Sequence, residues 1–415
     1  MRCAVGRLDV AETKKLAKDA TGPLKGIRIL DMTSVVNGAY GVQILADQGA
    51  EVIKIEDPAG SRGGGGDIMR WSGHLPEGVK PGMGPIFLTI NRNKRSVVLD
   101  LKTPEGQRAL RRLVKSCDAL VTSVRYQGMK RLGLAYEDIV ELKPDIVFVH
   151  AAGYGSDGPY AGEPAYDDLI QSASGCADIL PRTDGNPVPR IVPTLMADKV
   201  SGLFLSQAVT AALLHRQRTG EGQFVEVPMF ECVTSFLMVE HLFDHVFEPP
   251  TGQYGYTRVV NPNRKPFKTR DGYIGLLPYT DKQWDQFFEI AGWGETIAKD
   301  PRFSDYVTRN RHARELYAMV ETVTQERTTQ EWLDLLKPLS IPVVRTNRLD
   351  ELETDPHLAS VELFETYEHP DIGAYKQIRP PVRFSKTPSN IRRHPPRLGE
   401  HTAEVLAEIA EDEEA

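Results

Sequence analysis

The sequence predicts an α/β protein in which helices flank a parallel sheet, followed by a smaller domain. Short apolar runs alternate with helical segments, and the first strand, helix and strand fit within about 30 residues, as a parallel βαβ unit requires. The same alternation recurs over the first half of the chain, which is typical of a doubly wound sheet. The chain has 415 residues, of which 40% are hydrophobic and 26% charged, and this fits two globular domains.

The first unit begins near residue 27. Residues 27–32 form a short apolar run, residues 39–48 have a helical periodicity that ends at Gly49, and residues 51–56 are apolar at alternate positions. We therefore expect a strand, a helix and a strand in that order.

Later units follow the same pattern. Pro104 stands at a favoured first helical position, and Arg216 and Arg218 precede Gly220, where a helix is expected to end. These signals predict strands at 96–101, 119–124, 146–150 and 224–227, and helices at 104–115, from 136 onward and at 198–214. Arg131 lies just beyond the second of these strands, where ligands collect in open α/β sheets.

A change of composition marks the end of the large domain. An apolar helix follows residue 231, and Pro249 and Gly252 then interrupt regular structure. Farther on, an Asp271-Gly272 turn predicts a hairpin over 267–277, and the last part of the chain is rich in proline. The predicted parts are a large domain at 1–230, a linker helix at 231–250, a small α+β domain at 251–340, and a linker with a C-terminal segment that returns to the large domain at 341–415.

Composition and charge exclude several classes of partner. The net charge is −7 and the pI is about 5.9, so no overall positive field attracts nucleic acid or a membrane surface. No run reaches the roughly 20 apolar residues that span a bilayer, and the N-terminus lacks the apolar core of a signal peptide, so we expect a cytoplasmic protein. The cysteines are far apart, which favours free thiols over disulfides or a zinc site: Cys3, Cys117, Cys176 and Cys232.

The commonest catalytic signatures are absent from the sequence. Residues 33–38, which connect the first strand to its helix, have no G-x-G-x-x-G, so a nicotinamide or flavin dehydrogenase is disfavoured. G-x-S-x-G, H-E-x-x-H and phosphate-loop motifs are also missing, and no cluster of metal ligands is present. The run Gly63–Gly66 fits either a phosphate-binding loop or an ordinary surface loop, and we assign it no catalytic role.

Several charged residues have two interpretations each. Residues 91–96 place three cations before a predicted strand, which suits either a nucleotide with several phosphates or a solvated loop. Asp198 is expected at a helix start, where a carboxylate commonly caps the helix. A carboxylate near the backbone donors there would instead stay ionised and attack an activated acyl group. Asp167 and Asp168 follow Tyr166 at another expected helix start, and position alone decides neither case.

Seven stretches in a fixed order resemble a known family. They are residues 23–31, 45–56, 93–96, 99–102, 153–160, 218–223 and 398–402. Together they resemble the family III CoA-transferases, a superfamily that includes formyl-CoA:oxalate CoA-transferase, carnitine CoA-transferase and α-methylacyl-CoA racemase. The resemblance covers nearly the whole chain after about residue 22.

The resemblance implies a mechanism, site residues and an assembly. The family's catalytic aspartate corresponds to Asp198, which would form a mixed anhydride with the acyl group and then a thioester with CoA. Coenzyme A then enters as part of an acyl-CoA substrate, a carboxylic acid is the second substrate, and no metal is required. The family's fold is a Rossmann-like large domain with a small domain, in a homodimer whose chains interlock. The family's CoA-binding positions correspond to Val35, Leu99, Lys102 and Arg131, with Ser123 in place of an asparagine that contacts CoA.

The residue at position 166 helps to distinguish the two reactions that the family catalyses, CoA transfer and racemisation. The racemase has a histidine base followed by an acid where this chain has Tyr166 and Asp167. Tyrosine, with a pKa of about 10, is a poor general base near neutrality, so we expect acyl-CoA:carboxylate CoA transfer ahead of 2-methylacyl-CoA racemisation. A third alternative is a CoA-ester-binding protein without turnover. Val36 and Asp57 stand where the formyl enzyme has glutamine and arginine, which disfavours oxalate as the acceptor.

Overall fold

The computed structural model describes residues 13–58, 64–79 and 81–414, and they form two compact units. The large unit comprises the chain up to Ser174, Val192–Phe236 and the chain from Pro356. The small unit comprises Gly175–Ile191 and Leu237–Asp355. The chain therefore leaves the large unit twice and ends in it.

The large unit is built on a six-stranded sheet in the order β3-β2-β1-β4-β5-β6, in which every neighbouring pair is parallel. The strand order reverses between β1 and β4, as it does in a Rossmann-type sheet. The doubly wound α/β fold predicted from the sequence is confirmed. The strands are β1 (Arg28–Met32), β2 (Glu51–Glu56), β3 (Lys94–Val98), β4 (Ala119–Thr122), β5 (Val147–Ala152) and β6 (Gln223–Pro228).

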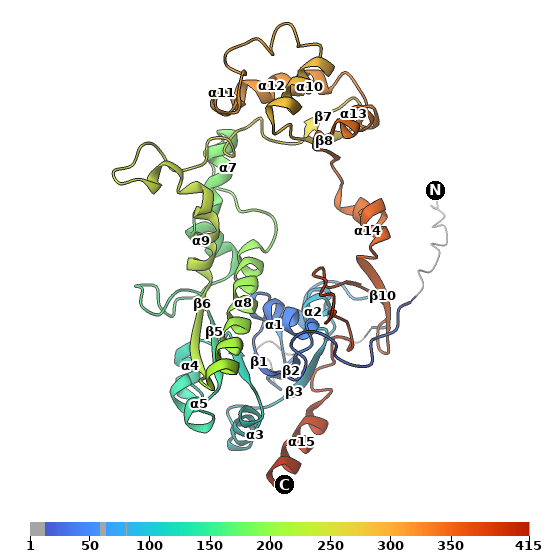
Figure 1. The fold of residues 1–415 in the computed structure, drawn as a ribbon. Coiled ribbons are helices and arrows are strands. Elements are labelled where there is room, and N and C mark those ends of the chain that lie inside the picture. The colour runs from blue at the N-terminus through green and yellow to red at the C-terminus, as the bar shows by residue number, and fades with distance from the viewer. Residues whose placement is uncertain (1–12, 59–63, 80, 415) are drawn as a thin grey trace. The chain divides into compact units, whose positions relative to one another are not determined.

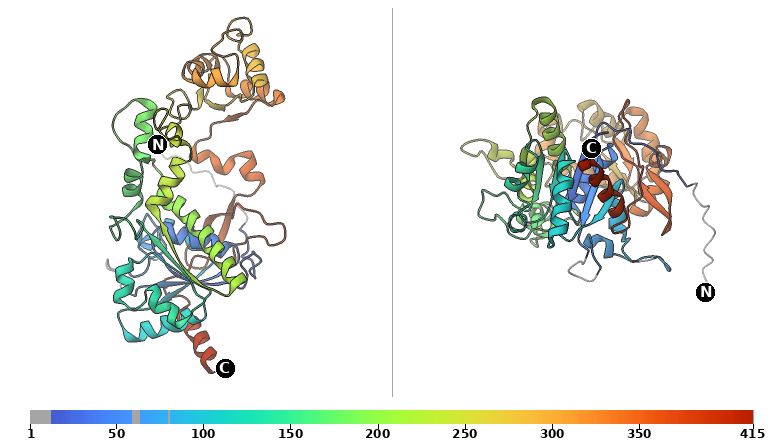
Figure 2. Two further views of the ribbon diagram at one scale, coloured as in Figure 1. Left: turned by 60° about the vertical axis from the view of Figure 1, so that its left-hand side comes forward. Right: turned by 90° about the horizontal axis from the view of Figure 1, so that it is seen from below.

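Helices cover both faces of this sheet (Figure 1 and Figure 2). On one face α1 (Asn37–Asp47) packs against α8 (Met196–Thr219), and their buried residues, such as Val42 and Leu205, share one apolar core. A second core lies on the opposite face, under α3 (Pro104–Lys115), α4 (Tyr126–Arg131), α5 (Tyr136–Leu142) and α15 (Thr402–Glu414). The shorter helices α2 (Pro85–Ile90) and α6 (Asp167–Ala173) complete the unit.

The C-terminal part of the chain is more regular than its prolines suggest. After α14 (Pro356–Ser360), an antiparallel hairpin forms from β10 (Phe364–His369) and β11 (Gly373–Ile378). The sequence pattern does not predict this hairpin, because polar residues such as Glu365 occupy its buried face. Farther on, the Asn390 N–H donates to the Asp47 carbonyl at 3.1 Å, which attaches the extended segment to the end of α1.

The small unit combines helices with an antiparallel sheet in the order β7-β8-β9. The predicted hairpin at 267–277 is present as β7 and β8, and Trp332 and Phe287 lie in the core. Throughout the described ranges, no helix is both long and apolar enough to cross a bilayer. The helix α9 (Met229–His241) begins in the large unit and ends in the small one. The α-helices and strands of the small unit are α7 (Cys176–Asp184), β7 (Phe267–Lys268), β8 (Tyr273–Leu276), α10 (Asp281–Ile290), α11 (Tyr306–Arg311), α12 (Ala313–Thr324), α13 (Thr329–Leu336) and β9 (Val343–Arg345).

Candidate active site

Two cavities lie at the carboxyl ends of the parallel strands, where α/β folds bind ligands. The first, called the Asp198 cavity, has a volume of about 220 Å³ and is lined by residues after β1, β4 and β5 and by the first turn of α8. The second, called the Lys102 cavity, has a volume of about 320 Å³ and is lined by residues at the ends of β1, β2 and β3. Ser34 lines both cavities, so they are neighbours on the same edge of the sheet.

Asp198 lies in the first turn of α8, which begins at Met196. It is 7% exposed and lines the first cavity. No described residue donates a hydrogen bond to its carboxylate, although its backbone N–H donates to Asp167 Oδ1 at 3.0 Å. The helix cap is Leu195, so the interpretation of Asp198 as a capping residue is wrong. Its carboxylate caps no helix and remains available to a molecule in the cavity.

The surroundings of Asp198 oppose its negative charge. Burial raises the pKa of this carboxyl to about 7, and the charges of Asp167 and Asp168 add to the effect. The expectation that backbone donors keep this carboxylate ionised is wrong, because among the described residues no N–H group reaches the side chain. Near neutral pH a large fraction of Asp198 is protonated, and the ionised fraction is poorly stabilised and therefore a better nucleophile.

The loop after β1 has an unusual backbone conformation beside this cavity. Val35 has a φ of 65°, a left-handed conformation that costs a β-branched residue on the order of 1–3 kcal/mol. Its N–H donates to Asp67 Oδ1 at 3.1 Å, and the Ser34 N–H donates to Ser123 Oγ at 3.2 Å. These two bonds fix the loop, and they bring Val35 and Ser123 to the wall of the Asp198 cavity.

Two adjacent residues at the start of α6, Tyr166 and Asp167, differ in their exposure. Tyr166 is 65% exposed and lines the Asp198 cavity. Asp167 is buried, and it accepts hydrogen bonds from the Asp198 N–H and from Gln171 Nε2, the latter at 2.6 Å. Tyr166 can therefore touch a molecule in the cavity, whereas Asp167 holds the backbone of Asp198 in position.

The other residues selected by the resemblance lie around the second cavity. Leu99 and Lys102 both line the Lys102 cavity. Arg131, the last residue of α4, lines neither cavity, although the next residue, Leu132, lines the Lys102 cavity. Of the predicted residues, Leu99 and Lys102 thus line one cavity, Arg131 lines neither, and the others that face a cavity line that of Asp198.

Part of the glycine run also reaches the second cavity. Gly63 lies outside the described residues, whereas Gly66 lines the Lys102 cavity together with Asp57. A Cβ atom on Gly64 would lie 2.1 Å from the ring of Trp71, so close packing requires glycine at that position.

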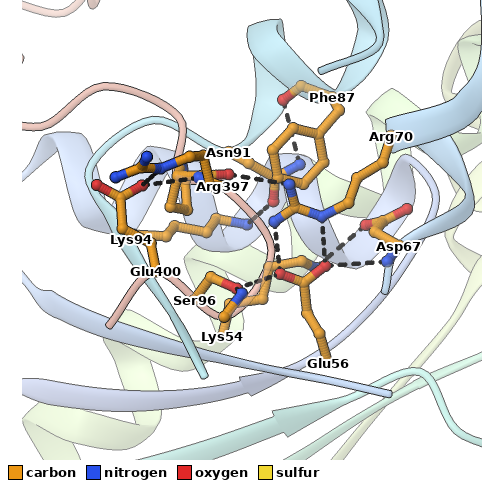
Figure 3. Close-up of polar contacts among 12 residues, drawn as sticks. Lys54, Glu56, Asp67, Arg70, Phe87, Asn91, Lys94, Ser96, Arg397 and Glu400 are labelled. Atoms are coloured by element: carbon orange, nitrogen blue, oxygen red, sulfur yellow. Dashed lines mark hydrogen bonds and ion pairs between the residues drawn. The ribbon is translucent and has the colours of Figure 1, made fainter. Parts of the chain in front are cut away.

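A network of buried charges supports the Lys102 cavity, and most of it is drawn in Figure 3. Its members are Asp31, Lys54, Glu56, Asp67, Arg70 and Lys94. Lys54 Nζ lies 3.1 Å from Asp67 Oδ2, and Lys94 Nζ lies 3.0 Å from Asp31 Oδ2. Burial and the charge of Lys54 lower the pKa of Lys94 to about 8, against the opposing charge of Asp31. Each cation in the network has an internal carboxylate partner, as buried charges require.

The three cations of residues 91–96 also belong to the interior. Arg92, Lys94 and Arg95 are almost fully buried, and Arg92 Nη2 lies 2.7 Å from Asp47 Oδ2. Both expectations for this segment, a phosphate site and a solvated loop, are wrong, because every one of these cations pairs with a carboxylate of the large unit. Lys94 and Arg95 lie inside β3, which begins two residues earlier than predicted.

Comparison with known proteins decides the family. The sequence profile of CoA-transferase family III matches residues 24–402. The chain belongs to family III of the CoA-transferases. It is 32% identical over 395 residues to the succinate–glutarate CoA-transferase of Agrobacterium fabrum, covering 93% of this chain and 96% of that protein. It is 31% identical over 391 residues to the succinyl-CoA:glutarate CoA-transferase of Mus musculus, covering 94% and 87%. The crystal structure of a CAIB/BAIF family protein from Brucella suis matches with a TM-score of 0.77 at 27% identity, covering 94% and 100%.

Membership confirms the resemblance drawn from the sequence motifs. The protein is an enzyme, a family III CoA-transferase, and CoA thioesters are its substrates. In the part of the chain that the structure describes, no three His, Cys, Asp or Glu side chains gather as metal ligands.

Besides Ser34, three polar residues of this CoA-transferase line the Asp198 cavity but were not selected from the sequence. They are Asn37, Arg125 and Glu163. The signal that singled out Arg131, a cation shortly after a strand, applies equally to Arg125. Asn37 and Glu163 have no comparable signal, because each reads as an ordinary polar residue of a helix start or a loop.

Proposed function

We propose that this CoA-transferase moves CoA between carboxylic acids through covalent intermediates on Asp198. The observation that carries the proposal is a buried carboxylate, free of hydrogen bonds from the described residues, on the wall of a cavity where the strand order of the sheet reverses. Such a carboxylate needs no general base, and its partial desolvation favours attack on an acyl carbon. The names of the relatives, which are CoA-transferases acting on acids, support the same chemistry.

The proposed reaction has two half-reactions that balance without water or ATP. An oxygen of Asp198 attacks the acyl-CoA carbonyl carbon, the C–S bond breaks, and CoA leaves as the thiolate, so that Asp198 and the acyl group remain joined as a mixed anhydride. The thiolate then attacks the aspartyl carbonyl, and the donor acid leaves with one oxygen of Asp198. The acceptor carboxylate next attacks the aspartyl–CoA thioester, which releases the thiolate and forms a second mixed anhydride. The thiolate then attacks the acceptor's carbonyl carbon in this anhydride and becomes the new acyl-CoA. Asp198 thereby recovers its carboxylate with one oxygen from the acceptor.

The neighbouring residues receive roles by their place in the two cavities. Val35, Ser123 and Tyr166 line the Asp198 cavity, so we assign them contacts with the thioester end of the substrate. Leu99 and Lys102 line the other cavity, where Lys102 supplies a positive charge for the phosphates of CoA. We assign Arg131, at the edge of the Lys102 cavity, a second contact with these phosphates. Asp167 positions Asp198 by accepting a hydrogen bond from the backbone N–H of Asp198.

Dicarboxylic acids are the substrate class that we propose. Both relatives described above are named for succinate and glutarate, or their CoA derivatives. The Asp198 cavity, at about 220 Å³, is smaller than the ~300–1,000 Å³ typical of ligand pockets, which favours short acyl chains. Val36 lines this cavity in place of a glutamine of the formyl enzyme, consistent with an acceptor other than oxalate.

An interlocked homodimer is part of the proposal, as is the cytoplasmic location expected from the sequence. Leu203 on α8 and Phe236 on α9 are each 52% exposed. Large apolar residues on long helices are commonly covered by a second chain. Both residues belong to the large unit, so this support does not depend on the small unit.

Hydroxylamine trapping tests the proposal. Hydroxylamine converts an activated aspartyl group into a stable hydroxamate, which peptide mass spectrometry locates after incubation with a panel of acyl-CoAs. We expect a hydroxamate on Asp198 in the wild-type enzyme and none in Asp198→Asn. The oxygen balance gives a second test without a trap: an acceptor acid labelled with heavy oxygen leaves one heavy oxygen on Asp198.

Other outcomes contradict the proposal and point to the alternatives. If the enzyme bound CoA but gave neither a hydroxamate nor oxygen transfer with any acyl-CoA of the panel, covalent transfer through Asp198 would be contradicted. Solvent deuterium entering the α position of a 2-methylacyl-CoA would then support racemisation. Binding without either reaction would support a CoA-ester-binding protein.

The rate of acyl transfer is expected to fall about tenfold per pH unit below pH 7. Only the ionised carboxylate attacks, and burial raises the pKa of Asp198 to about 7. Asp168→Asn removes an exposed negative charge that disfavours ionisation, so it is expected to lower that pKa and to raise the rate at pH 6. Asp167→Asn is expected to move the profile further in the same direction, because the charge of Asp167 has the larger effect.

First-turnover release of CoA, measured between about pH 5 and pH 9, gives this profile. High salt is expected to imitate Asp168→Asn in part, because an exposed charge is screened. A profile that is flat across this range, or one that both variants move toward alkaline pH, would contradict the role given to the Asp198 carboxylate.

A further inference from the structure

Arg125 is an unpaired cation on the wall of the Asp198 cavity. It is the single arginine or lysine among the described residues that line this cavity. No described residue forms an ion pair or hydrogen bond with its guanidinium, whereas Arg70 and Arg92 in the same unit pair with internal carboxylates. A cation without an internal partner on the wall of the nucleophile's cavity is available to an anionic ligand.

Arg125 and Asp198 reach the cavity from different elements. Arg125 comes just after β4, which ends at Thr122, and Asp198 comes from the first turn of α8. No hydrogen bond or ion pair joins the guanidinium of Arg125 to the carboxylate of Asp198, although both residues line the same cavity. A molecule lying between the two residues can therefore touch both.

We propose that Arg125 binds the distal carboxylate of a dicarboxylic acyl group while the other end of that group reacts at Asp198. The inference rests on the proposed CoA transfer through Asp198 and adds the residue that selects the substrate class. A guanidinium offers two parallel N–H donors in a planar arrangement that matches a carboxylate. A substrate held at both ends has its reacting carbon fixed near the nucleophile.

The same guanidinium serves both half-reactions. Donor and acceptor take the same place in turn, because both react at Asp198. A dianionic acid entering this cavity meets the negative charge of Glu163, while Asp198 is held as its neutral thioester, and Arg125 offsets the repulsion from Glu163. Without Arg125, a dicarboxylate loses its advantage over a monocarboxylate of the same length.

The phosphates of CoA are the other anions that Arg125 could bind. Lys102 lines the neighbouring cavity, and Arg131 lies beside it, at the end of the substrate that we assign to those phosphates. Arg125 instead shares its cavity with the nucleophile. We therefore assign Arg125 to the acyl end, and the experiment separates the two roles.

The test compares glutarate with pentanoate, an acid of the same chain length, as acceptors from one fixed acyl-CoA donor. Arg125→Gln is expected to lower kcat/KM for glutarate by ~10–100-fold, mainly through KM, and to change kcat/KM for pentanoate by less than ~3-fold. Arg125→Lys is expected to keep part of the preference for glutarate, because the charge remains but the planar fork is lost. Lys130→Gln removes a nearby exposed cation of α4 that lines neither cavity. This variant is expected to leave kcat/KM unchanged for both glutarate and pentanoate.

Several results would overturn the assignment. Equal losses for both acids, with weaker CoA binding, would place Arg125 at CoA. If Arg125→Gln left the ratio of kcat/KM for glutarate to kcat/KM for pentanoate unchanged, Arg125 would not select the substrate. A wild-type enzyme that forms the hydroxamate without preferring glutarate would contradict this role as well. Absence of the hydroxamate in the wild type contradicts the proposed CoA transfer itself, so the two failures are distinguishable. Arg125 is exposed, and equal melting temperatures of variant and wild type verify that the variant folds.

Discussion

Asp198→Asn is expected to reduce CoA transfer by at least about 10⁴-fold, because an amide forms neither the anhydride nor the thioester. The same substitution is expected to raise the free energy of unfolding at pH 8 by about 2–4 kcal/mol. One cause underlies both effects. The carboxylate is buried, with Asp167 and Asp168 nearby, so the charge that performs the reaction is also a charge that the folded protein resists.

The stability effect has a defined pH window. The pKa of Asp198 is about 7 in the folded protein and about 4 in the unfolded chain. A pKa raised by folding contributes stability that is complete below about pH 4 and is lost as the pH rises to about 7. Asparagine undergoes no such loss. The gain of the variant over wild type is therefore expected to be small near pH 4 and to reach its full size by pH 8.

Urea unfolding at the two pH values, together with the transfer assay, measures both effects. Asp157→Asn is the matched control, because Asp157 is an exposed aspartate of the large unit that lines neither cavity. It is expected to change neither activity nor stability. Transfer above about 1% of wild type in Asp198→Asn, with deamidation excluded by mass spectrometry, would contradict the role of Asp198.

Much of the fold could be predicted because parallel strands buried on both faces are almost continuously apolar. β5 shows this most clearly, since all of its residues are buried. The sequence pattern predicts the start of β3 two residues late, because Lys94 and Arg95 resemble loop residues until their carboxylate partners are known. The hairpin of β10 and β11 was missed for a related reason, because Glu365 and His369 lie on its buried face.

The candidate site could be predicted only in outline. The resemblance selected Asp198, Val35 and Tyr166, and the structure places all three on one cavity. The raised pKa of Asp198 could not be predicted, because it arises from burial and from charges that no local pattern encodes. Arg125 and Arg131 share one signal, a cation shortly after β4, and only the three-dimensional arrangement shows which of them lines a cavity.

Arg70→Leu is expected to cost about 3–5 kcal/mol of the free energy of unfolding at pH 7. Arg70 is fully buried, and its guanidinium donates to Glu56 Oε1 at 2.6 Å and to Glu56 Oε2 at 2.8 Å. It also donates to the Pro396 carbonyl at 2.9 Å, which links β2 to the C-terminal segment. Leucine removes these bonds and leaves the charge of Glu56 buried without a cation at its side.

Lowering the pH is expected to reduce the loss of unfolding free energy caused by Arg70→Leu. Burial alone would raise the pKa of Glu56, but the hydrogen bonds and charge of Arg70 hold it below its ordinary value. A lowered pKa contributes stability that is present above the unfolded pKa of about 4 and is lost as the pH falls. Without Arg70 the pKa of Glu56 rises, so the variant gains stability on protonation. The difference between wild type and Arg70→Leu is therefore expected to be largest near pH 7 and to shrink toward pH 4.

Arg108→Leu is the matched control, because Arg108 pairs with Glu105 at 2.6 Å on an exposed surface. Its expected effect on unfolding, measured in urea, is within about 0.5 kcal/mol at both pH values. Replacing both partners, in Arg70→Leu with Glu56→Leu, is expected to recover part of the loss, because no uncompensated charge stays buried. A cost for Arg70→Leu as small as that for Arg108→Leu, or one that grows in acid, would show that the Glu56 charge is not what Arg70 compensates.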